Sequence, residues 1–397
     1  MRIFKSYYIT NNMTTKLNVL QVIPKLGYGG AETGCYDIAH FLSENDCGSF
    51  LATSGGELLK FIKKDKVKLI RLPVHSKNPF LILFNALILI IYILLFKIHI
   101  VHARSRAPAW SCYFASLITR RVFVTTFHGT YNFKSNLKKF YNSIMLRAKL
   151  TIAGSNFIFG HINDNYSEYL SKEKKLRVIF RGINVDYYNS KNISILKQEK
   201  LKEEWGLSSN KFTILLPGRL TSWKGQEKFI EALNILIEDY GIVNFQAIIL
   251  GSDQGRKVYS KKLINLIERY NLQKKTKFIN HCNEMPLAYS LADVVVSASI
   301  EPEAFGRVSV EAQSMGKPII ASNIGGSKET IINKKTGFLY KHDDPRELAK
   351  SINTVIQLSP DELKSIGNEG RKNITKKFDV EIMCQSNLKE YRRLIKN

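Results

Sequence analysis

The sequence predicts an α/β protein of two domains, each built on a parallel sheet with helices on both faces. The chain has 397 residues, enough for two ordinary domains, and 44% of them are hydrophobic, enough for two cores. Short apolar runs alternate with helical stretches, as in parallel sheets joined by crossover helices. A polar connector at about 186–209 separates two such series. We therefore expect a leader at 1–16, domains at 17–187 and 188–378, and a C-terminal helix at 379–397.

The first domain begins with a strand at 17–23, and a glycine-rich turn leads into a helix at about 31–43. Gly27, Gly29 and Gly30 form that turn. It lacks the third glycine of a dinucleotide fingerprint, because Glu32 stands at that position. Further buried runs predict the other strands of the sheet, at 49–53, 67–72, 98–102, 122–127, 150–153 and 177–180.

Residues 80–96 form a strongly apolar segment, with Asn85 as its one clearly polar member. A helix over this segment would be about 25 Å long, short of the ~30 Å hydrocarbon core of a bilayer. The strand at 98–102 follows at once, so a spanning helix would place parts of one sheet on opposite sides of a membrane. We expect a helix that packs on the sheet and exposes one face to a bilayer interface. A fully buried crossover helix is the alternative.

The second domain repeats the alternation of strands and helices. Its buried runs predict strands at 212–217, 245–251, 277–280, 294–297 and 319–322. Helices are expected at 226–240, 260–270 and 285–291, followed by the helix that contains Glu311.

The net charge is +25, and the basic excess is larger in the first half. Residues 1–190 carry 26 Lys and Arg against 10 Asp and Glu, and no acidic residue occurs from Val67 to Asn163. A basic surface is typical of nucleic-acid binders, but no nucleic-acid module is recognisable here. Because the acid-free stretch contains the apolar segment, we expect an anionic membrane surface as partner, and not nucleic acid.

The five cysteines are scattered, odd in number and without a C-x-x-C pair. This distribution argues against a disulfide framework and against a structural zinc site. The N-terminal residues lack the apolar run of a signal peptide. We therefore expect a cytoplasmic protein, peripheral on the cytoplasmic face of the inner membrane.

The most informative stretch runs from Glu303 to Glu311, two glutamates in a loop that enters a helix. Gly306 lets the backbone approach a ligand closely, and the free N–H groups that open the helix make a phosphate site. Glu311 could reach a ribose diol, as an acidic residue does in dinucleotide folds. Gly316 then ends the helix. One short window thus offers places for a sugar, a diphosphate and a nucleoside.

This window resembles the E-x7-E signature of family 4 retaining glycosyltransferases, which adopt the GT-B fold of two Rossmann-like domains facing across a cleft. Other motifs similar to those of the family follow in the expected order: Gly27–Glu32, His128-Gly129, Arg181–Asn184, Gly218–Leu220 with Lys224-Gly225, and Gly325–Glu329. The resemblance covers about 17–391. It implies a nucleoside diphosphate sugar as donor, retention of anomeric configuration, and a last helix that returns to the first domain.

The resemblance also implies roles for single residues. Catalytic roles are expected for His128, Glu303, Arg219 and Lys224. Donor binding is expected from Gly27, Gly29, Gly30, Phe305, Gly306, Arg307, Val308 and Glu311. We assign Glu32, Arg104 and Arg106 to the acceptor, and Arg181 and Asn184 to the floor of the cleft. Within this scheme Glu303 contacts the sugar hydroxyls, and His128 faces the sugar near its reacting carbon.

Transfer from such a donor requires that the leaving diphosphate be neutralised. The sequence contains no D-x-D metal motif. Arg219, Lys224 and the N–H groups at 305–308 are therefore expected to neutralise it, with no obligatory metal and no cofactor.

Together these features predict a retaining glycosyltransferase of the EC 2.4 class. Its acceptor would be a lipid-linked glycan of lipopolysaccharide or another envelope polysaccharide. A nucleotide-sugar epimerase or hydrolase of the same fold, and an inactive scaffold in an assembly complex, stay open as alternatives.

Overall fold

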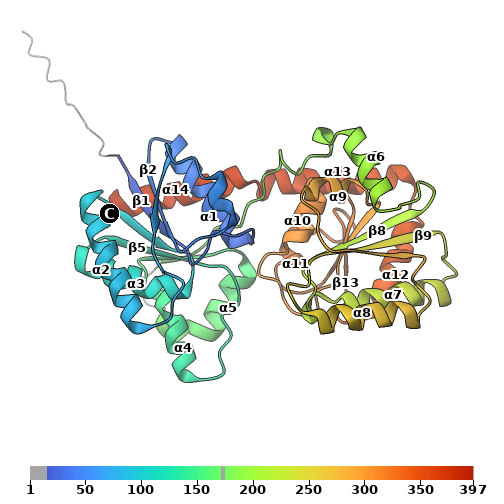
Figure 1. Cartoon of the computed structure of the whole chain (residues 1–397), viewed down its shortest axis with the longest axis horizontal. Helices are drawn as coiled ribbons and strands as arrows, with labels where there is room; N and C mark the ends of the chain where they lie inside the picture. The colour runs from blue at the N-terminus through green and yellow to red at the C-terminus, as the bar shows by residue number, and fades with distance from the viewer. Residues whose placement is uncertain (1–15, 171–174, 397) are drawn as a thin grey trace, which may run out of the picture. The chain divides into compact units, whose positions relative to one another are not determined.

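The computed structural model describes residues 16–170 and 175–396, and the predicted leader lies outside them apart from Lys16. Contacts divide the chain into two units. The first runs to Thr125 and resumes at Leu388, and the second runs from Thr126 to Asn387. Two sheets with helices on their faces confirm the predicted α/β architecture of two Rossmann-like domains (Figure 1). The boundary predicted at 187/188 stays a prediction.

The first sheet has seven strands in the order β3-β2-β1-β4-β5-β6-β7. They are β1 Asn18–Val22, β2 Gly48–Thr53, β3 Val67–Arg71, β4 Ile100–Ala103, β5 Val122–Phe127, β6 Leu150–Ala153 and β7 Lys175–Val178. The strand order reverses between β1 and β4, which pair in parallel from Val19 with Ile100 to Val22 with Ala103. Open α/β sheets bind ligands at such a switch point, outside the carboxyl ends of the strands.

Helices and short 3₁₀ turns connect these strands. They are α1 Gly30–Glu44, η1 Glu57–Phe61, α2 Pro79–Leu95, α3 Arg106–Thr119, α4 Asn136–Ser143, η2 Ile144–Leu146, α5 Asn156–Tyr166 and η3 Ser167–Tyr169. The core below α1 is built from apolar residues of the strands, the helix and η1, such as Ile23, Cys35, Leu51 and Leu58.

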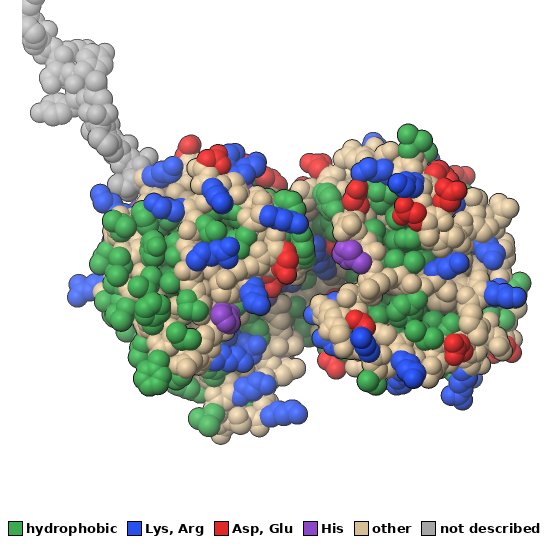
Figure 2. Space-filling view, viewed as in Figure 1, with side chains coloured by type: hydrophobic (Ala, Val, Ile, Leu, Met, Phe, Trp, Pro, Cys, Tyr) green, Lys and Arg blue, Asp and Glu red, His purple; other side chains and the backbone are tan. Residues whose placement is uncertain are grey.

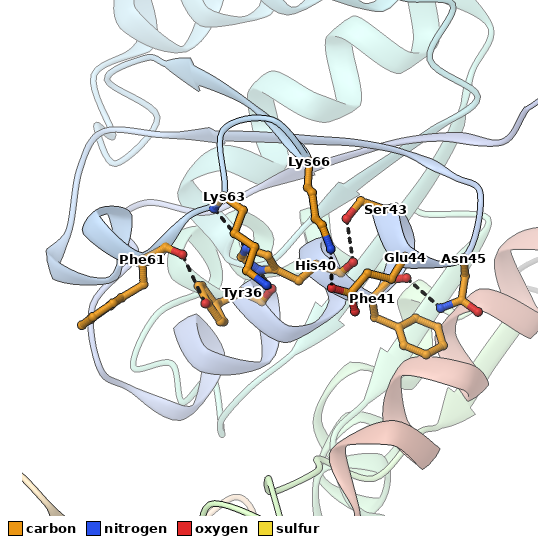
Figure 3. A network of polar contacts seen from close by, with 9 residues as sticks. All are labelled: Tyr36, His40, Phe41, Ser43, Glu44, Asn45, Phe61, Lys63 and Lys66. Atoms are coloured by element: carbon orange, nitrogen blue, oxygen red, sulfur yellow. Dashed lines mark hydrogen bonds and ion pairs between the residues drawn. The ribbon is translucent and has the colours of Figure 1, made fainter.

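His40 attaches the segment after η1 to α1 (Figure 3). The backbone N–H of Lys63 donates to its Nε2 at 3.3 Å, and its Nδ1 lies 3.0 Å from the carbonyl oxygen of Tyr36. Because Nε2 accepts, Nδ1 carries the proton and donates to that carbonyl. Burial lowers the pKa of His40, which keeps the ring neutral in this role. An ion pair of 2.9 Å between Lys66 and Glu44 holds the same segment at its far end.

The apolar segment forms α2, which packs against α3 (Figure 1). Its inner face buries Ile82, Asn85, Ala86, Leu89 and Ile93. Its outer face, called the α2 apolar face below, exposes Phe80, Leu83, Phe84, Leu87, Ile91, Leu94 and Leu95. Figure 2 shows hydrophobic side chains gathered over α2 and α3.

The exposure of α2 decides between the two predictions made for it. Leu87 and Leu95 are 61% and 67% exposed, so the fully buried alternative is wrong and the prediction of one exposed face is confirmed. Across residues 16–170 and 175–396, no helix has both the length and the apolar character needed to cross a bilayer. Contact of the α2 apolar face with a membrane stays a prediction.

The second sheet has six strands in the order β10-β9-β8-β11-β12-β13. They are β8 Phe212–Pro217, β9 Phe245–Leu250, β10 Thr276–Ile279, β11 Val294–Ser297, β12 Ile319–Ser322 and β13 Phe338–Tyr340. The order reverses between β8 and β11, which pair in parallel, Val294 with Ile214. The second sheet therefore has its own switch point.

The connections of the second sheet are mostly helical. They are η4 Ser190–Asn192, α6 Ile195–Glu204, η5 Ser222–Lys224, α7 Gln226–Glu238, α8 Lys257–Arg269, α9 Met285–Ser290, α10 Arg307–Ser314, α11 Ser327–Thr330, α12 Pro345–Ile356, α13 Pro360–Lys377 and α14 Val380–Lys396. The end of α14 belongs to the first unit, where the hydroxyl of Tyr391 lies 2.6 Å from Nδ1 of His102.

Candidate functional site

An ion pair with largely buried side chains lies at the switch point of the second sheet. Lys224 ends η5, which follows β8, and Glu303 lies in the loop after β11. Nζ of Lys224 is 2.7 Å from Oε1 of Glu303, and the two side chains are 13% and 10% exposed. Ser299, also after β11, donates its hydroxyl to the same oxygen at 2.5 Å. Side chains from the ends of both strands thus meet where the strand order reverses.

Arg219 adds a second cation beside this pair, since its charge also lowers the pKa of Glu303. Burial opposes ionisation of Glu303, but the charge of Lys224 and its hydrogen bond outweigh burial and hold the pKa of that carboxyl below its ordinary value. Glu303 is therefore ionised at neutral pH and offsets Lys224. Arg219 is exposed, with its guanidinium carbon 5.9 Å from the ring centroid of Trp223. It forms no ion pair with a described residue.

Gly225 explains how Lys224 reaches Glu303. It has a φ of +72° and is the N-cap of α7. A Cβ at this position would lie 1.8 Å from the carbonyl oxygen of Ala298, just after β11. Any side chain would therefore push η5 away from the end of β11. The Lys-Gly pair in the sequence thus acts through backbone packing, which sets Lys224 against the loop of Glu303.

The window between the two glutamates forms an open helix N-terminus, as predicted. Gly306 has a φ of +82° and is the N-cap of α10. Its carbonyl accepts the N–H groups of Ser309 and Val310, at 3.1 and 3.3 Å. The N–H groups of Arg307 and Val308 come earlier in the first turn and have no helical acceptor. This is the geometry of an anion site.

Two side chains donate hydrogen bonds to Glu311, and Tyr188 also interacts with it. Arg307 Nε donates to its Oε1 at 2.5 Å, and the hydroxyl of Tyr289 donates to its Oε2 at 2.7 Å. Both oxygens therefore have partners, and a ribose diol at Glu311 has to share or displace one of them. Arg307 is the more accessible of these two partners, since its side chain is 38% exposed whereas Tyr289 is fully buried.

Ser299 and Tyr289 are functional candidates that the sequence analysis missed. Ser299 follows a predicted strand and lies four residues before Glu303. A polar side chain at the end of a strand is the signal by which it could have been predicted. Tyr289 lies on α9, and no local motif connects that helix to Glu311.

His128 is oriented by Arg181. The histidine follows β5 and the arginine follows β7, and Nη2 of Arg181 lies 2.8 Å from Nδ1 of His128. The arginine passes over Gly154, at the end of β6, where a Cβ would lie 3.5 Å from Arg181 Cγ. Arginine only donates, so Nδ1 of His128 holds a lone pair and Nε2 carries the proton of the neutral ring. Arg181, predicted to shape a cleft floor, thus selects the tautomer of His128.

Asn184, the other residue predicted for the cleft floor, has a local role. Its side-chain oxygen accepts the N–H groups of Asp186 and Tyr187, at 3.1 and 2.8 Å. This is an Asx-type turn, which explains an asparagine at this position without a ligand.

The remaining predicted site residues belong to the first unit. Gly29 is the N-cap of α1, Glu32 lies in its first turn, and Gly27 and Gly30 complete the same loop. Arg104 follows β4 and is buried, and Arg106 begins α3. These residues gather at the switch point of the first sheet. That they share one ligand with Glu303 stays a prediction.

Two family models match the chain in succession. The model described as Glycosyltransferase Family 4 matches residues 28–187, and the model described as Glycosyl transferases group 1 matches residues 197–373. The crystal structure of a glycosyltransferase from Rickettsia africae ESF-5 is similar to this chain, with 38% identity and a TM-score of 0.88. That match covers 96% of this chain and 100% of the other.

More distant relatives extend the comparison. The Anabaena protein Alr3699/HepE, solved in complex with UDP and glucose, shares the fold at a TM-score of 0.79 and 24% identity, over 95% of this chain and 100% of that one. Spore coat protein SA of Bacillus subtilis is 28% identical over 57% of this chain and 61% of its own length. The capsular polysaccharide biosynthesis glycosyltransferase CapM of Staphylococcus aureus is 26% identical over 57% of this chain and 58% of its own. The chain thus spans about three fifths of these curated relatives.

Proposed function

The chain belongs to the glycosyltransferases of family 4, and from that premise we propose that it moves a sugar from a nucleoside diphosphate donor to a lipid-linked glycan, with retention of anomeric configuration. The observation that carries the proposal is the buried pair of Lys224 and Glu303 beside the open N-terminus of α10. It combines a fixed carboxylate for sugar hydroxyls with cations and N–H groups for a diphosphate.

Different residues of the second unit bind different parts of the donor. Glu303, held ionised by Lys224, accepts hydrogen bonds from the sugar hydroxyls. Arg219 and the N–H groups of Arg307 and Val308 bind the diphosphate. Because Lys224 and Glu303 offset each other, Arg219 supplies most of the net charge that stabilises the leaving group.

His128 contributes a hydrogen bond rather than proton transfer. With Nδ1 accepting from Arg181, the proton sits on Nε2, and this N–H is the group that meets a sugar hydroxyl. We propose no obligatory metal and no cofactor, since side chains and a helix N-terminus provide the charge stabilisation that a metal would provide.

The α2 apolar face gives the proposed location and acceptor class. Eight large apolar side chains are exposed on this helix, the seven of the α2 apolar face and Leu81. The surrounding stretch from Val67 to Asn163 carries basic but no acidic residues. Apolar side chains with a basic surround suit the interface of an anionic bilayer. We therefore propose a peripheral position on the cytoplasmic face of the inner membrane, where a lipid-linked envelope glycan is within reach. CapM, which builds capsular polysaccharide, is a relative with a compatible role.

The test of this function is nucleotide binding followed by transfer. Thermal unfolding is measured with UDP, GDP, ADP and CMP on the wild type and on Glu303→Gln and Glu311→Ala. A ligand at 100 times its Kd stabilises by about 2.7 kcal/mol. One nucleotide should stabilise the wild type, and Glu311→Ala should lose most of that effect. Glu303→Gln should keep nucleotide binding but lose transfer.

Three outcomes contradict the proposal in different ways. Release of free sugar without any acceptor favours a hydrolase. If the protein binds a nucleotide but transfers no sugar to any lipid-linked glycan in an assay with intact membranes, an inactive scaffold is favoured. Inversion of the anomeric configuration in the product removes the retaining mechanism.

A further inference from the structure

Arg104 is a buried arginine at the switch point of the first sheet. It directly follows β4, and its backbone N–H donates to the carbonyl oxygen of Val22, at the end of β1, at 2.9 Å. The residue is only 3% exposed. Its position in the first sheet corresponds to that of the Lys224 and Glu303 pair in the second, since both follow the strands between which the order reverses.

The charge of Arg104 has no direct counter-ion in the part of the chain that the structure describes. It forms no ion pair there, and its buried Nε has no hydrogen-bond partner. Burial of a cation without a partner is strongly unfavourable. Lys224, by contrast, is buried together with a carboxylate. An anionic ligand would give Arg104 the compensation that Glu303 gives Lys224.

The N-terminus of α3 lies next to Arg104 in the chain and adds to the positive potential. Ser105 is the N-cap of α3, and its side chain makes no capping hydrogen bond. The first turn of α3 contains no acidic residue and begins with Arg106. Pro108 has no N–H, so the N–H groups of Arg106 and Ala107 are the ones in this turn that favour an anion. Two independent features, a buried guanidinium and an uncapped helix start, therefore point to the same kind of ligand.

The N-terminus of α1 differs, because an acidic side chain already occupies it. A Cβ on Gly29 would lie 2.2 Å from Oε2 of Glu32, so the carboxylate folds back over the helix start. The charges of Arg104 and Glu32 both act on the thiol of Cys35, in the second turn of α1. The guanidinium therefore lies near α1, with Glu32 as an acidic side chain on that side.

We propose that Arg104 and the first turn of α3 bind an oxyanion group of the acceptor, either a phosphate ester or a carboxylate. This rests on the proposed glycosyl transfer. The planar guanidinium forms paired hydrogen bonds with either group. The donor diphosphate has its own cation and helix start in the second unit, Arg219 and α10. An acceptor with a phosphorylated or uronic acid residue is therefore the substrate class that this site selects.

The test compares Arg104→Gln with Arg269→Gln, which removes the same charge from the exposed end of α8. Thermal unfolding of the full chain is followed with inorganic phosphate and, separately, with glucuronate. One of the two should raise the melting temperature of the wild type and of Arg269→Gln by about 3 °C, and Arg104→Gln should lose the response. The anion that raises the melting temperature shows whether the site binds a phosphate or a carboxylate.

The ligand-free proteins give a second readout. Because Arg104 is uncompensated, Arg104→Gln should melt at the same temperature as the wild type or higher. A purely structural arginine would lower it. If Arg104→Gln fails to fold, Arg104 is structural and the proposal is overturned. Arg104→Lys keeps the charge without the planar fork, and it should retain a weakened response to the same probe.

Further outcomes overturn the proposal and separate it from the donor site. Equal responses of Arg104→Gln and wild type, or no response of the wild type to either anion, exclude an anion site at Arg104. Loss of the nucleotide response in Arg104→Gln assigns the arginine to the donor and not to the acceptor. Absence of any nucleotide response in the wild type contradicts the proposed transferase, but leaves the phosphate or glucuronate result unchanged.

Discussion

Lys224 and Glu303, which are 79 positions apart in the sequence, are joined by a contact of 2.7 Å between Nζ and Oε1. Both side chains are largely buried, and they come from the two strand ends between which the order of the second sheet reverses. Each needs the other, because either charge alone would be buried without compensation.

Removing one member of this pair should therefore destabilise the protein more than removing both. We expect Lys224→Met to lower the free energy of unfolding by about 3 kcal/mol, at the lower end of the range for a broken buried pair. The double variant Lys224→Met, Glu303→Gln should recover most of that loss and still lack transfer activity. Urea unfolding of the single and double variants measures this. A double variant whose loss is the sum of the two single losses would show that the pair is not coupled.

Replacement of Gly225 should affect both stability and the donor site. Gly241 is a matched control, because it has a similar φ of +65° but no atom within 4 Å of the added Cβ. Gly241→Ala should lose only about 1–2 kcal/mol to the left-handed backbone. Gly225→Ala should lose more, since its Cβ meets the carbonyl oxygen of Ala298, and should also weaken nucleotide binding. Equal losses in the two variants would mean that η5 moves without consequence for Lys224.

The tautomer of His128 should depend on Arg181. In ¹⁵N-histidine NMR spectra, the wild-type His128 signal, assigned with His128→Gln, should show the proton on Nε2. Arg181→Gln should show a mixture of tautomers and a kcat lower by about 10- to 100-fold, with little change in KM. Arg181→Lys keeps a donor and should restore the tautomer. A wild-type spectrum with the proton on Nδ1 would contradict the geometry.

His102 should make the first unit sensitive to acid. Burial, and then the charge of Arg104, lower the pKa of His102 well below its ordinary value. The unfolded chain therefore binds a proton at a higher pH than the folded one, and stability is lost as the pH falls below about 6.5. The slope from this residue should reach about 1.4 kcal/mol per pH unit. The free energy of unfolding of the wild type and of His102→Gln is measured by urea unfolding between about pH 7.5 and about pH 5. This range lies on both sides of the ordinary histidine pKa of about 6.5, so the two pH profiles can be compared. Parallel profiles would exclude the effect.

The α2 apolar face should bind anionic vesicles. The double variant Leu87→Ser, Ile91→Ser removes two side chains that are 61% and 57% exposed. We expect its vesicle affinity to fall by at least about 10-fold in co-sedimentation. The control Ile195→Ser, Leu196→Ser removes two exposed side chains from α6 and should bind as the wild type does. Equal binding by both variants would exclude α2 as the contact.

Several elements could be predicted because local sequence determines them. The strands at 212–217, 294–297 and 319–322 agree with β8, β11 and β12 to the residue, since each is a buried apolar run flanked by polar residues. Two long helices, α12 and α13, were missed although their start signals are in the sequence. Asp344 caps α12 before Pro345, and Ser359 with Glu362 forms a capping box at the start of α13.

The contacts that build the site could not be predicted in the same way. Arg307 with Glu311 is a helical i, i+4 pair and is accessible to sequence reasoning. The contacts of Tyr289 with Glu311 and of Arg181 with His128 depend on how separate elements pack. No spacing rule connects residues that approach each other only through the order of strands in a sheet. The buried and unpaired state of Arg104 likewise became visible only with the packing around it.

The contact between Tyr391 and His102 has a consequence for how the protein is made. The first unit consists of the chain up to Thr125 and the segment from Leu388 onward. At ribosomal rates of about 5–20 residues per second, the intervening 126–387 take roughly 13–52 s to synthesise. During that interval the nascent first unit lacks the helix end that covers His102, and it offers an unfinished surface to chaperones. Completion of the first unit therefore waits for the synthesis of the second, and a stop codon just before Leu388 would damage the unit whose larger part was translated first.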